Sequence, residues 1–186
     1  MFVLYLIGTY LIGSIPFGLI IAFIAYDIDI RNHGSKNIGM SNVLRTVGLK
    51  PALLTLTGDV GKGWFMLAAS PFTETWELTL IGMAVLLGHC YSIFLQGKGG
   101  KAVATSMGVL LYQLPGTALI LAGTWLVVRL LTKKSSLASL SALTLLLPLT
   151  LYNDSRILWL SLFITGLIVL RHKENIERLR THSELD

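Results

Sequence analysis

The sequence predicts an all-α fold: a polytopic membrane bundle of about seven transmembrane helices, with short or broken spans around a site on the cytoplasmic side. The first observation is composition, because 53% of the 186 residues are hydrophobic and only 13% are charged, about half the charged fraction of a soluble domain. The second is a series of long apolar segments, and the third is the gathering of basic residues in alternate loops. Together with a mean hydropathy of +0.69, these features place the chain in the membrane class.

The apolar segments give the helix count, since a bilayer core of roughly 30 Å needs about 20 apolar residues per helix. The first segment contains Pro16 and has no basic residues before it, so it differs from a cleaved signal peptide. The second contains the ionisable residues Asp59 and Lys62, and the fourth is short and follows a glycine-rich loop. The predicted spans are residues 1–26, 51–72, 76–95, 102–114, 115–131, 137–152 and 157–170.

The basic residues agree with this count and orient the chain. With seven spans, four loop or tail segments fall on one side of the membrane, and they carry most of the 15 Lys and Arg residues. The positive-inside rule places that side and the C-terminus in the cytoplasm and the N-terminus outside. We predict one integral membrane domain, residues 1–186, in which residues 173–186 form a polar cytoplasmic tail. The basic segments are 27–50, 96–101, 132–136 and 171–186.

The charge balance and the motif content exclude several classes of function. The net charge of +5 suits nucleic acid, an anionic membrane surface or anionic substrates, but dispersal of the basic residues among short loops argues against nucleic acid. Cys90 is the only cysteine, so no internal disulfide is possible. The sequence has no G-x-S-x-G elbow, no Asp/Glu cluster and no His/Cys metal spacing. We therefore expect no metal, no cofactor and no acyl-enzyme.

Residues 31–45 form the first candidate anion-binding loop. Gly34 and Gly39 let the backbone aim successive N–H groups at one point, and short polar side chains with basic neighbours suit a phosphate. The alternative is a solvated cytoplasmic loop made of ordinary turn residues. The candidate donors are Arg31, Ser35, Lys36, Asn37, Ser41, Asn42 and Arg45.

Residues 97–105 form the second candidate loop, which opens the short fourth span. A glycine-rich turn that leads into a helix N-terminus binds anions through backbone dipoles, and Lys98 and Lys101 add full charges. The spacing of a Walker A loop is absent, so ATP or GTP is not implied. The alternative is that the two lysines only anchor the chain on the cytoplasmic side.

Asp59 and Lys62 lie inside the second span, where ionisable residues are costly and usually face the protein interior. Their i, i+3 spacing puts them on one helix face, where they can pair. A structural ion pair and a direct role in the site remain equally open. For His89, at the end of the third span, we favour a structural role.

Three further polar residues lie at span ends on the basic face. His172 follows the last span and suits a general base or a phosphate ligand, although a lone histidine at the membrane interface is more often a plain surface residue. Ser136 and Ser139 begin the sixth span, where hydroxyl groups cap helices and can also face a shared site.

These motifs occur together in one order. They are Gly13-Ser14-Ile15-Pro16-Phe17-Gly18, the loop 31–45, Asp59-x-x-Lys62-Gly63, Gly88-His89, Lys98-Gly99-Gly100-Lys101, Ser136-Leu137-x-Ser139 and Arg171-His172-x-x-Asn175-Ile176-x-Arg178-Leu179. In this order and at these spacings, nearly the whole chain resembles the bacterial acyl-phosphate:glycerol-3-phosphate acyltransferases, small membrane enzymes of phospholipid synthesis. Three positions depart from the family pattern: Ser41 stands for Thr, Ala102 for Gly, and His182 for the Gly two residues before Glu184.

The resemblance implies transfer of a fatty acyl group from acyl phosphate to the 1-hydroxyl of glycerol 3-phosphate, the first acylation step of phospholipid synthesis, at the bacterial inner membrane. The products would be lysophosphatidic acid and phosphate, the partners the two substrates and the lipid bilayer, and the active form a monomer. Since acyl phosphate is already activated, we expect direct attack by the hydroxyl, helped by positioning and charge stabilisation. Either His172 or a phosphate oxygen of the donor would take the proton.

The resemblance also implies roles for single residues. The expected catalytic residues are Ser35, Arg45, Lys101, His172 and Asn175. The expected acyl-phosphate contacts are Ser35, Lys36, Asn37, Gly39, Ser41 and Asn42. The expected glycerol-3-phosphate contacts are Arg45, Lys98, Gly99, Gly100, Lys101, Ser139 and His172. The expected supporting residues are Asp59, Lys62, His89 and Glu184.

Two other functions fit parts of the pattern. A transporter or channel for a phosphate-type anion would use the basic loops and the ionisable residues of the second span, but the outer loops are short and acidic and the last three spans carry almost no charge. A scaffold for anionic lipid would use the basic face alone, and it would not need the glycine-rich loops.

Overall fold

All regular structure in the part of the chain that the computed structural model describes, residues 1–184, is helical. The α-helices are α1 (Phe2–Gly13), α2 (Phe17–Tyr26), α3 (Met40–Thr46), α4 (Leu49–Ala68), α5 (Thr75–Cys90), α6 (Val103–Gln113), α7 (Pro115–Thr132), α8 (Ser135–Leu143), α9 (Leu146–Asn153), α10 (Leu158–Arg171) and α11 (Lys173–Arg180). Short 3-10 turns are η1 (Ile30–Asn32), η2 (Ile93–Leu95) and η3 (Ser155–Ile157). The predicted tail therefore contains a helix, and its residues 185–186 lie outside the described chain.

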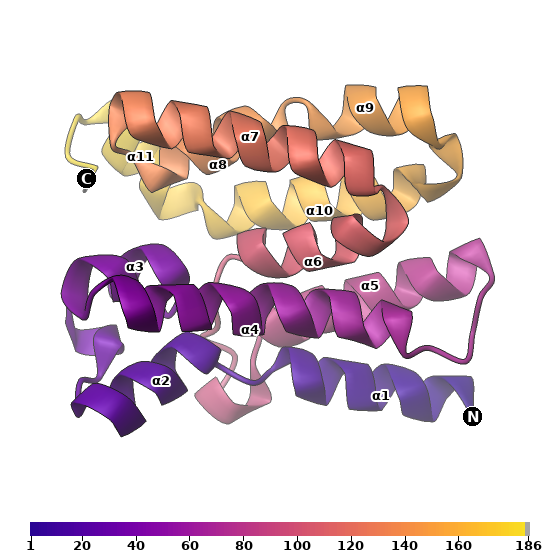
Figure 1. Ribbon diagram of the computed structural model, residues 1–186, viewed down its shortest axis with the longest axis horizontal. Helices are drawn as coiled ribbons and strands as arrows, with labels where there is room; N and C mark the ends of the chain where they lie inside the picture. The colour runs from indigo at the N-terminus through magenta and orange to yellow at the C-terminus, as the bar shows by residue number, and fades with distance from the viewer. Residues whose placement is uncertain (185–186) are drawn as a thin grey trace.

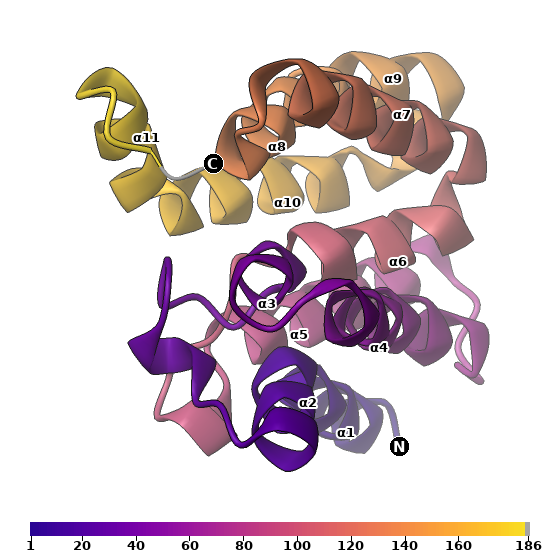
Figure 2. The same ribbon diagram turned by 60° about the vertical axis from the view of Figure 1, so that its left-hand side comes forward.

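The helices form two layers (Figures 1 and 2). One layer contains α1 to α6 and the other contains α7 to α11, and α6 and α10 face each other where the layers meet. The start of α1 and the short helix α11 lie at opposite ends of the long axis (Figure 1). Helix α3, the end of α10 and the loop before α6 lie in the half of the bundle away from the start of α1 (Figure 1).

Close backbone approach holds the first layer together. A Cβ atom on Gly63 of α4 would lie 2.3 Å from the carbonyl oxygen of Thr105 in α6, and one on Gly108 would lie 2.0 Å from that of Val60. Small residues let membrane helices pack this tightly. The glycines of α4 and α6 thus fix the short helix α6 against the long helix α4, which positions the loop before α6.

The first predicted span is broken. Helices α1 and α2 meet at an angle of 41°, and Pro16 lies at the break, where its ring and missing N–H prevent a continuous helix. The break frees the carbonyl of Ile15, which accepts a hydrogen bond from Lys62 Nζ at 2.9 Å. Ser92 Oγ donates to the neighbouring carbonyl of Ser14 at 2.6 Å. Polar side chains of other helices therefore satisfy the backbone groups that the break exposes.

The structure supports fewer straight spans than the predicted seven. Within the described residues, three segments are long and apolar enough to cross a membrane: Thr75–Leu95, Pro115–Thr132 and Ser135–Asn153. Counting each bent pair, α1 with α2 and α10 with α11, gives up to five. The predicted fourth span is too short, because the 11 residues of α6 extend about 16 Å. Helix α4 has 20 residues, but Asp59 and Lys62 interrupt its apolar surface.

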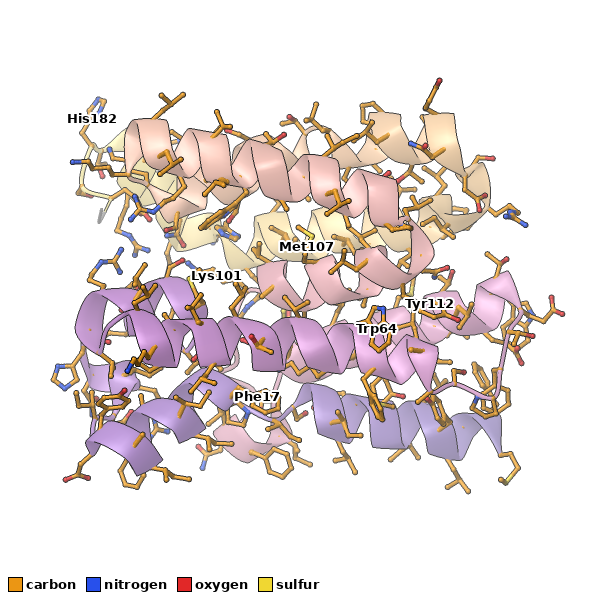
Figure 3. All side chains as sticks on the ribbon, in the orientation of Figure 1. Phe17, Trp64, Lys101, Met107, Tyr112 and His182 are labelled. Carbon is orange, nitrogen blue, oxygen red and sulfur yellow. The ribbon has the colours of Figure 1, made fainter. Side chains whose placement is uncertain are left out.

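The exterior of the bundle is apolar, as a lipid-facing surface requires. Leu131, Ile24 and Trp159 are among many large apolar side chains that are mostly exposed. Figure 3 shows side chains projecting outward around the bundle, whereas the labelled Lys101 and Met107 lie at the level between the two layers. The space between the layers is the location of the candidate site.

Candidate active site

One pocket between the two layers contains polar residues from both candidate loops, from the second span and from the ends of the third, sixth and seventh predicted spans. It encloses about 380 Å³. Its polar part is lined by Ser35, Asn37, Gly39, Ser41, Asn42, Arg45, Asp59, His89, Lys101, Ser106, Ser135, Ser136, Ser139, His172, Asn175 and Glu184. The five residues expected to be catalytic all line it, from positions up to 140 residues apart in the chain.

Asn42 organises the first loop from inside. Its side chain, 1% exposed, accepts from the backbone N–H of Ser35 at 2.9 Å and donates to the carbonyl of Asn37 at 2.8 Å and that of His33 at 3.1 Å. The Asn37 side chain in turn accepts from the N–H of Gly39 at 2.9 Å. The amide of Asn42 is therefore occupied in holding the loop, which differs from the expected direct contact with acyl phosphate.

The loop around Asn42 turns the other expected ligands toward the pocket. Ser35, Asn37, Gly39 and Ser41 line the pocket wall on this side, together with Arg45 of α3. Lys36 differs from the expectation: it is exposed, has a left-handed backbone with φ of 59°, and is not among the lining residues.

Two glycines of the second loop pack closely against the end of α5. The N–H of Gly99 donates to Cys90 O at 3.1 Å, and that of Gly100 donates to His89 O at 3.0 Å. A Cβ atom on Gly100 would lie 2.2 Å from His89 Nε2. These two amides donate to the end of α5, and the expected contact of Gly99 and Gly100 with glycerol 3-phosphate stays a prediction. Lys98 is exposed and does not line the pocket.

Lys101 is the residue of this loop that reaches the pocket. Its ammonium group donates to Asn175 Oδ1 of α11, and burial, together with the charge of nearby Arg178, lowers its pKa to about 8. It precedes the first turn of α6, whose N–H groups have no earlier helical carbonyl to bond, and Ala102, Val103 and Ala104 of this turn line the pocket. Lys101 and this helix end together form a positive wall.

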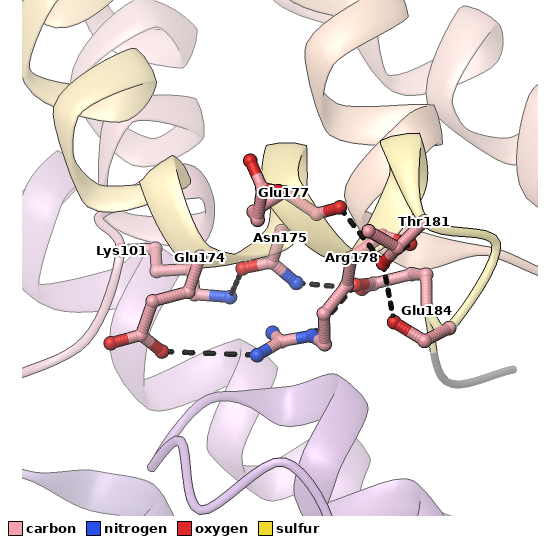
Figure 4. Close-up of polar contacts among 8 residues, drawn as sticks. Lys101, Glu174, Asn175, Glu177, Arg178, Thr181 and Glu184 are labelled. Carbon is pink, nitrogen blue, oxygen red and sulfur yellow. Dashed lines mark hydrogen bonds and ion pairs between the residues drawn. The ribbon is translucent and has the colours of Figure 1, made fainter.

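Asn175 is one member of a polar network that closes the pocket (Figure 4). Asn175 Nδ2 donates to Glu184 Oε1 at 2.6 Å, and Arg178 Nε donates to Glu184 Oε2 at 3.0 Å. Arg178 also faces Glu174, with 3.8 Å between Nη1 and Oε2. The carboxylate of Glu184 thus lies among cationic groups and holds the amide of Asn175 toward Lys101.

His172 lies just beyond the last residue of α10 and is 2% exposed. Its Nδ1 is 2.8 Å from the carbonyl oxygen of Ile168. A carbonyl only accepts, so Nδ1 carries the proton and Nε2 keeps its lone pair. Burial, followed by the charge of Lys101, lowers the pKa of His172 to about 4. The ring is therefore neutral at pH 7, and Nε2 is unprotonated.

Helix α8 contributes serine hydroxyl groups from the second layer. Ser136 and Ser139 are buried and line the pocket. Ser139 Oγ donates to Ser135 O at 2.9 Å and accepts from the indole Nε1 of Trp125 at 3.1 Å. Sequence reasoning missed Trp125, because a tryptophan in an apolar span resembles any other membrane residue.

Asp59 and Lys62 form the ion pair that their spacing permits, with 2.8 Å between Oδ1 and Nζ. His89 Nδ1 lies 3.5 Å from the same Asp59 oxygen. Asp59 and His89 line the pocket, whereas Lys62 points to Ile15 at the break between α1 and α2. The buried residues Asp59, Lys62 and His89 therefore connect the pocket wall to the break between α1 and α2.

The pocket continues from the polar groups into an apolar groove, which sequence reasoning did not predict. Its lining residues come from α4 and α6 of one layer and from α7, α8, α9 and α10 of the other. Its walls suit a hydrocarbon chain. They include Leu56, Val60, Met107, Leu110, Leu111, Leu121, Ala142, Leu143, Leu146, Ile164 and Ile168.

Among residues 1–184, no three His, Cys, Asp or Glu side chains gather as a possible metal-binding group.

This arrangement combines a cationic polar cavity, a neutral histidine with a free ring nitrogen, and an apolar groove. It suits a ligand that has an anionic head and a long apolar tail, next to a second anionic ligand. Such a pair of ligands fits acyl transfer at the surface of a membrane.

The comparisons with known proteins agree with this geometry. Residues 3–182 match the family model described as glycerol-3-phosphate acyltransferase. A glycerol-3-phosphate acyltransferase of Fusobacterium nucleatum is 40% identical, with 98% of this chain and 96% of that protein covered. The corresponding protein of Bacillus subtilis is 39% identical, with 97% and 95% covered.

Two solved structures have the same fold. The crystal structure of PlsY, an integral membrane glycerol 3-phosphate acyltransferase, in its glycerol 3-phosphate form, is 38% identical with a TM-score of 0.93, over 99% of this chain and 94% of that one. Its lysophosphatidic acid form is 36% identical with a TM-score of 0.91, over the same shares. The chain described here belongs to the glycerol-3-phosphate acyltransferase family of integral membrane enzymes.

Proposed function

We propose that this protein transfers a fatty acyl group from acyl phosphate to the 1-hydroxyl of glycerol 3-phosphate, giving lysophosphatidic acid and phosphate. The observation that carries the proposal is the single pocket in which a cationic cavity joins an apolar groove. Relatives described as bound to glycerol 3-phosphate and to lysophosphatidic acid support the acceptor and the product. Acyl phosphate as donor is supported by Ser35, Asn37, Gly39 and Ser41, polar loop residues of the same pocket that suit a second phosphate.

The two substrates divide the pocket between them. The acyl phosphate places its phosphate against Ser35, Asn37, Gly39 and Ser41 and its chain in the groove. Glycerol 3-phosphate places its phosphate near Lys101 and its hydroxyl near His172. The mixed anhydride is already activated, so the site has to align the reactants and stabilise negative charge.

The reaction is a direct displacement. The 1-hydroxyl oxygen of glycerol 3-phosphate bonds to the acyl carbonyl carbon, and the bond from that carbon to the phosphate oxygen breaks, so phosphate leaves with the electron pair. We assign the hydroxyl proton to His172 Nε2, because Nδ1 is already committed to the carbonyl of Ile168. Arg45 and Lys101 offset the charge that develops on the carbonyl and phosphate oxygens.

We place the site at the cytoplasmic face of the inner membrane. The basic segments and α11 lie in the half of the bundle away from the start of α1 (Figure 1), and the positive-inside rule assigns that side to the cytoplasm. Glycerol 3-phosphate then enters from the cytosol and the fatty donor from the bilayer. The pocket is built from one chain, so we propose that the monomer is active.

The donor is tested with purified protein in lipid bilayers. Incubation with acyl phosphate and labelled glycerol 3-phosphate should yield labelled lysophosphatidic acid and an equal amount of phosphate. Acyl-CoA at the same concentration should give far less product. Product formation from acyl-CoA alone would contradict the proposed donor while leaving the acceptor assigned.

A further inference from the structure

Arg171 has no role in the proposed reaction, yet it makes two hydrogen bonds and one cation–π contact. Its guanidinium donates from Nη2 to the carbonyl of Gly99 at 2.8 Å and from Nε to the carbonyl of Gly100 at 3.0 Å. The same group lies over the ring of Tyr91, with 5.4 Å from Cζ to the centroid. Arg171 thus binds a loop 71 residues earlier in the chain.

The loop is held from both sides at these two residues. The N–H groups of Gly99 and Gly100 donate to the last carbonyls of α5, and their carbonyls accept from Arg171. A planar guanidinium fits such a pair of acceptors with two fixed N–H directions. Four hydrogen bonds therefore fix the backbone immediately before Lys101.

Arg171 and Gly100 are each next in the chain to a proposed active-site residue. Gly100 precedes Lys101, and Arg171 precedes His172. The hydrogen bonds from Arg171 to Gly99 and Gly100, here called the clamp, therefore connect the immediate neighbours of two proposed active-site residues. The second connection between these segments is the hydrogen bond from Lys101 to Asn175. That bond must weaken when Lys101 turns to a substrate phosphate, whereas the contacts of Arg171 to the two carbonyls do not compete with an anion.

We propose that Arg171 is a positioning residue, which sets the spacing between Lys101 and His172 while glycerol 3-phosphate is bound. This inference rests on the proposed placement of glycerol 3-phosphate between these two residues. Acyl phosphate, which we place against the loop around Ser35, should not depend on Arg171.

The test measures kinetics of Arg171→Lys and Arg171→Ala in lipid bilayers, with each substrate varied in turn. Arg171→Lys keeps the positive charge but loses the planar guanidinium that can donate to both carbonyls. It should raise the KM for glycerol 3-phosphate roughly tenfold and leave the KM for acyl phosphate unchanged. Arg171→Ala should show the larger effect, and added ethylguanidine should restore part of its activity. Arg156→Ala, which removes an exposed arginine paired with Asp154, is the matched control and should behave as wild type.

The outcomes separate positioning from a general effect on folding. A merely structural role would lower the amount of active enzyme, so kcat would fall while both KM values stayed constant and ethylguanidine had no effect; that result overturns the proposal. Equal increases in both KM values would also overturn it. Direct binding of labelled glycerol 3-phosphate to the variants requires no acyl donor. It therefore tests the clamp even if acyl phosphate proves to be the wrong donor.

Discussion

Lys101 of the loop before α6 donates a hydrogen bond to Asn175 of α11, 74 residues further along the chain. Asn175 is held by Glu184, which Arg178 also binds (Figure 4). The ammonium group thus has a neutral amide oxygen as its partner. A phosphate dianion is a stronger acceptor for it, so substrate binding should draw Lys101 away from Asn175.

Lys101→Ala should weaken glycerol 3-phosphate binding. The variant loses at least one charge-assisted hydrogen bond to phosphate, worth roughly 1.5–3 kcal/mol, which corresponds to about a 10- to 150-fold rise in Kd. Binding of labelled glycerol 3-phosphate to the purified variant measures the change. Lys173→Ala, which removes an exposed lysine at the start of α11, is the control. An unchanged Kd for Lys101→Ala would exclude Lys101 as a ligand.

The pH dependence should reveal the same ammonium group. Burial lowers the pKa of Lys101 to about 8, so Lys101 is charged below that pH and loses its charge as the pH rises through it. We therefore expect kcat/KM for glycerol 3-phosphate to decrease above about pH 8. In Lys101→Arg the guanidinium stays charged, and this decrease should move to higher pH or vanish. A decrease at the same pH in both enzymes would assign it to another group.

His172→Gln should reduce kcat more than it changes the KM of either substrate. Removal of a general base typically costs about 10²–10⁴-fold, and glutamine keeps much of the polar volume without a basic nitrogen. Single-turnover rates with saturating substrates measure the effect. A loss of less than about tenfold would instead assign the hydroxyl proton to a phosphate oxygen of the donor.

Asn42→Ala should disorder the loop that we assign to acyl phosphate. The change leaves the N–H of Ser35 and the carbonyl of Asn37 without their partner, at a cost of roughly 1–3 kcal/mol for each buried group. The KM for acyl phosphate should rise while the affinity for glycerol 3-phosphate stays near wild type. Asn153→Ala, at an exposed helix end, serves as control. If the affinity for glycerol 3-phosphate fell while the KM for acyl phosphate stayed constant, the loop around Ser35 would bind glycerol 3-phosphate instead.

The buried Asp59–Lys62 pair should show strong coupling in stability. Asp59→Asn or Lys62→Met alone leaves one buried charge unpaired, which costs roughly 3–5 kcal/mol, whereas the double variant removes both charges. Thermal unfolding in detergent should therefore give a higher Tm for the double variant than for the less stable single variant. Additive losses in the double variant would mean that the two charges do not stabilise each other.

The sequence could predict the helical membrane fold from its long apolar segments. It could also predict ionisable residues of the pocket, because a charge inside or beside an apolar segment is costly and usually serves the function. Lys101 and His172 are such ionisable residues, and both line one pocket. Asn175, which lines the same pocket, is expected only from the family resemblance. The predicted count of seven spans stays unconfirmed, since length and composition support three to five within the described residues. Helix α6 is apolar because the protein buries it, and apolar residues packed against protein or against lipid have the same composition.

Other features depend on contacts between distant residues. The glycines at 99 and 100 suggested an anion cradle, and their missing side chains also make room for His89. Asn42 resembled a substrate donor, but its neighbours in space are backbone groups of its own loop. Trp125 reaches Ser139 only because α7 and α8 lie side by side. Local patterns identify which residues are polar, while the fold decides what each one touches.

Simultaneous occupancy of the pocket by both substrates is tested most directly by initial velocities at several fixed concentrations of each substrate. Direct transfer from acyl phosphate to glycerol 3-phosphate requires a ternary complex, so double-reciprocal plots should intersect. Parallel lines, together with release of phosphate before glycerol 3-phosphate is added, would show an acyl-enzyme intermediate and would contradict the mechanism proposed for this site.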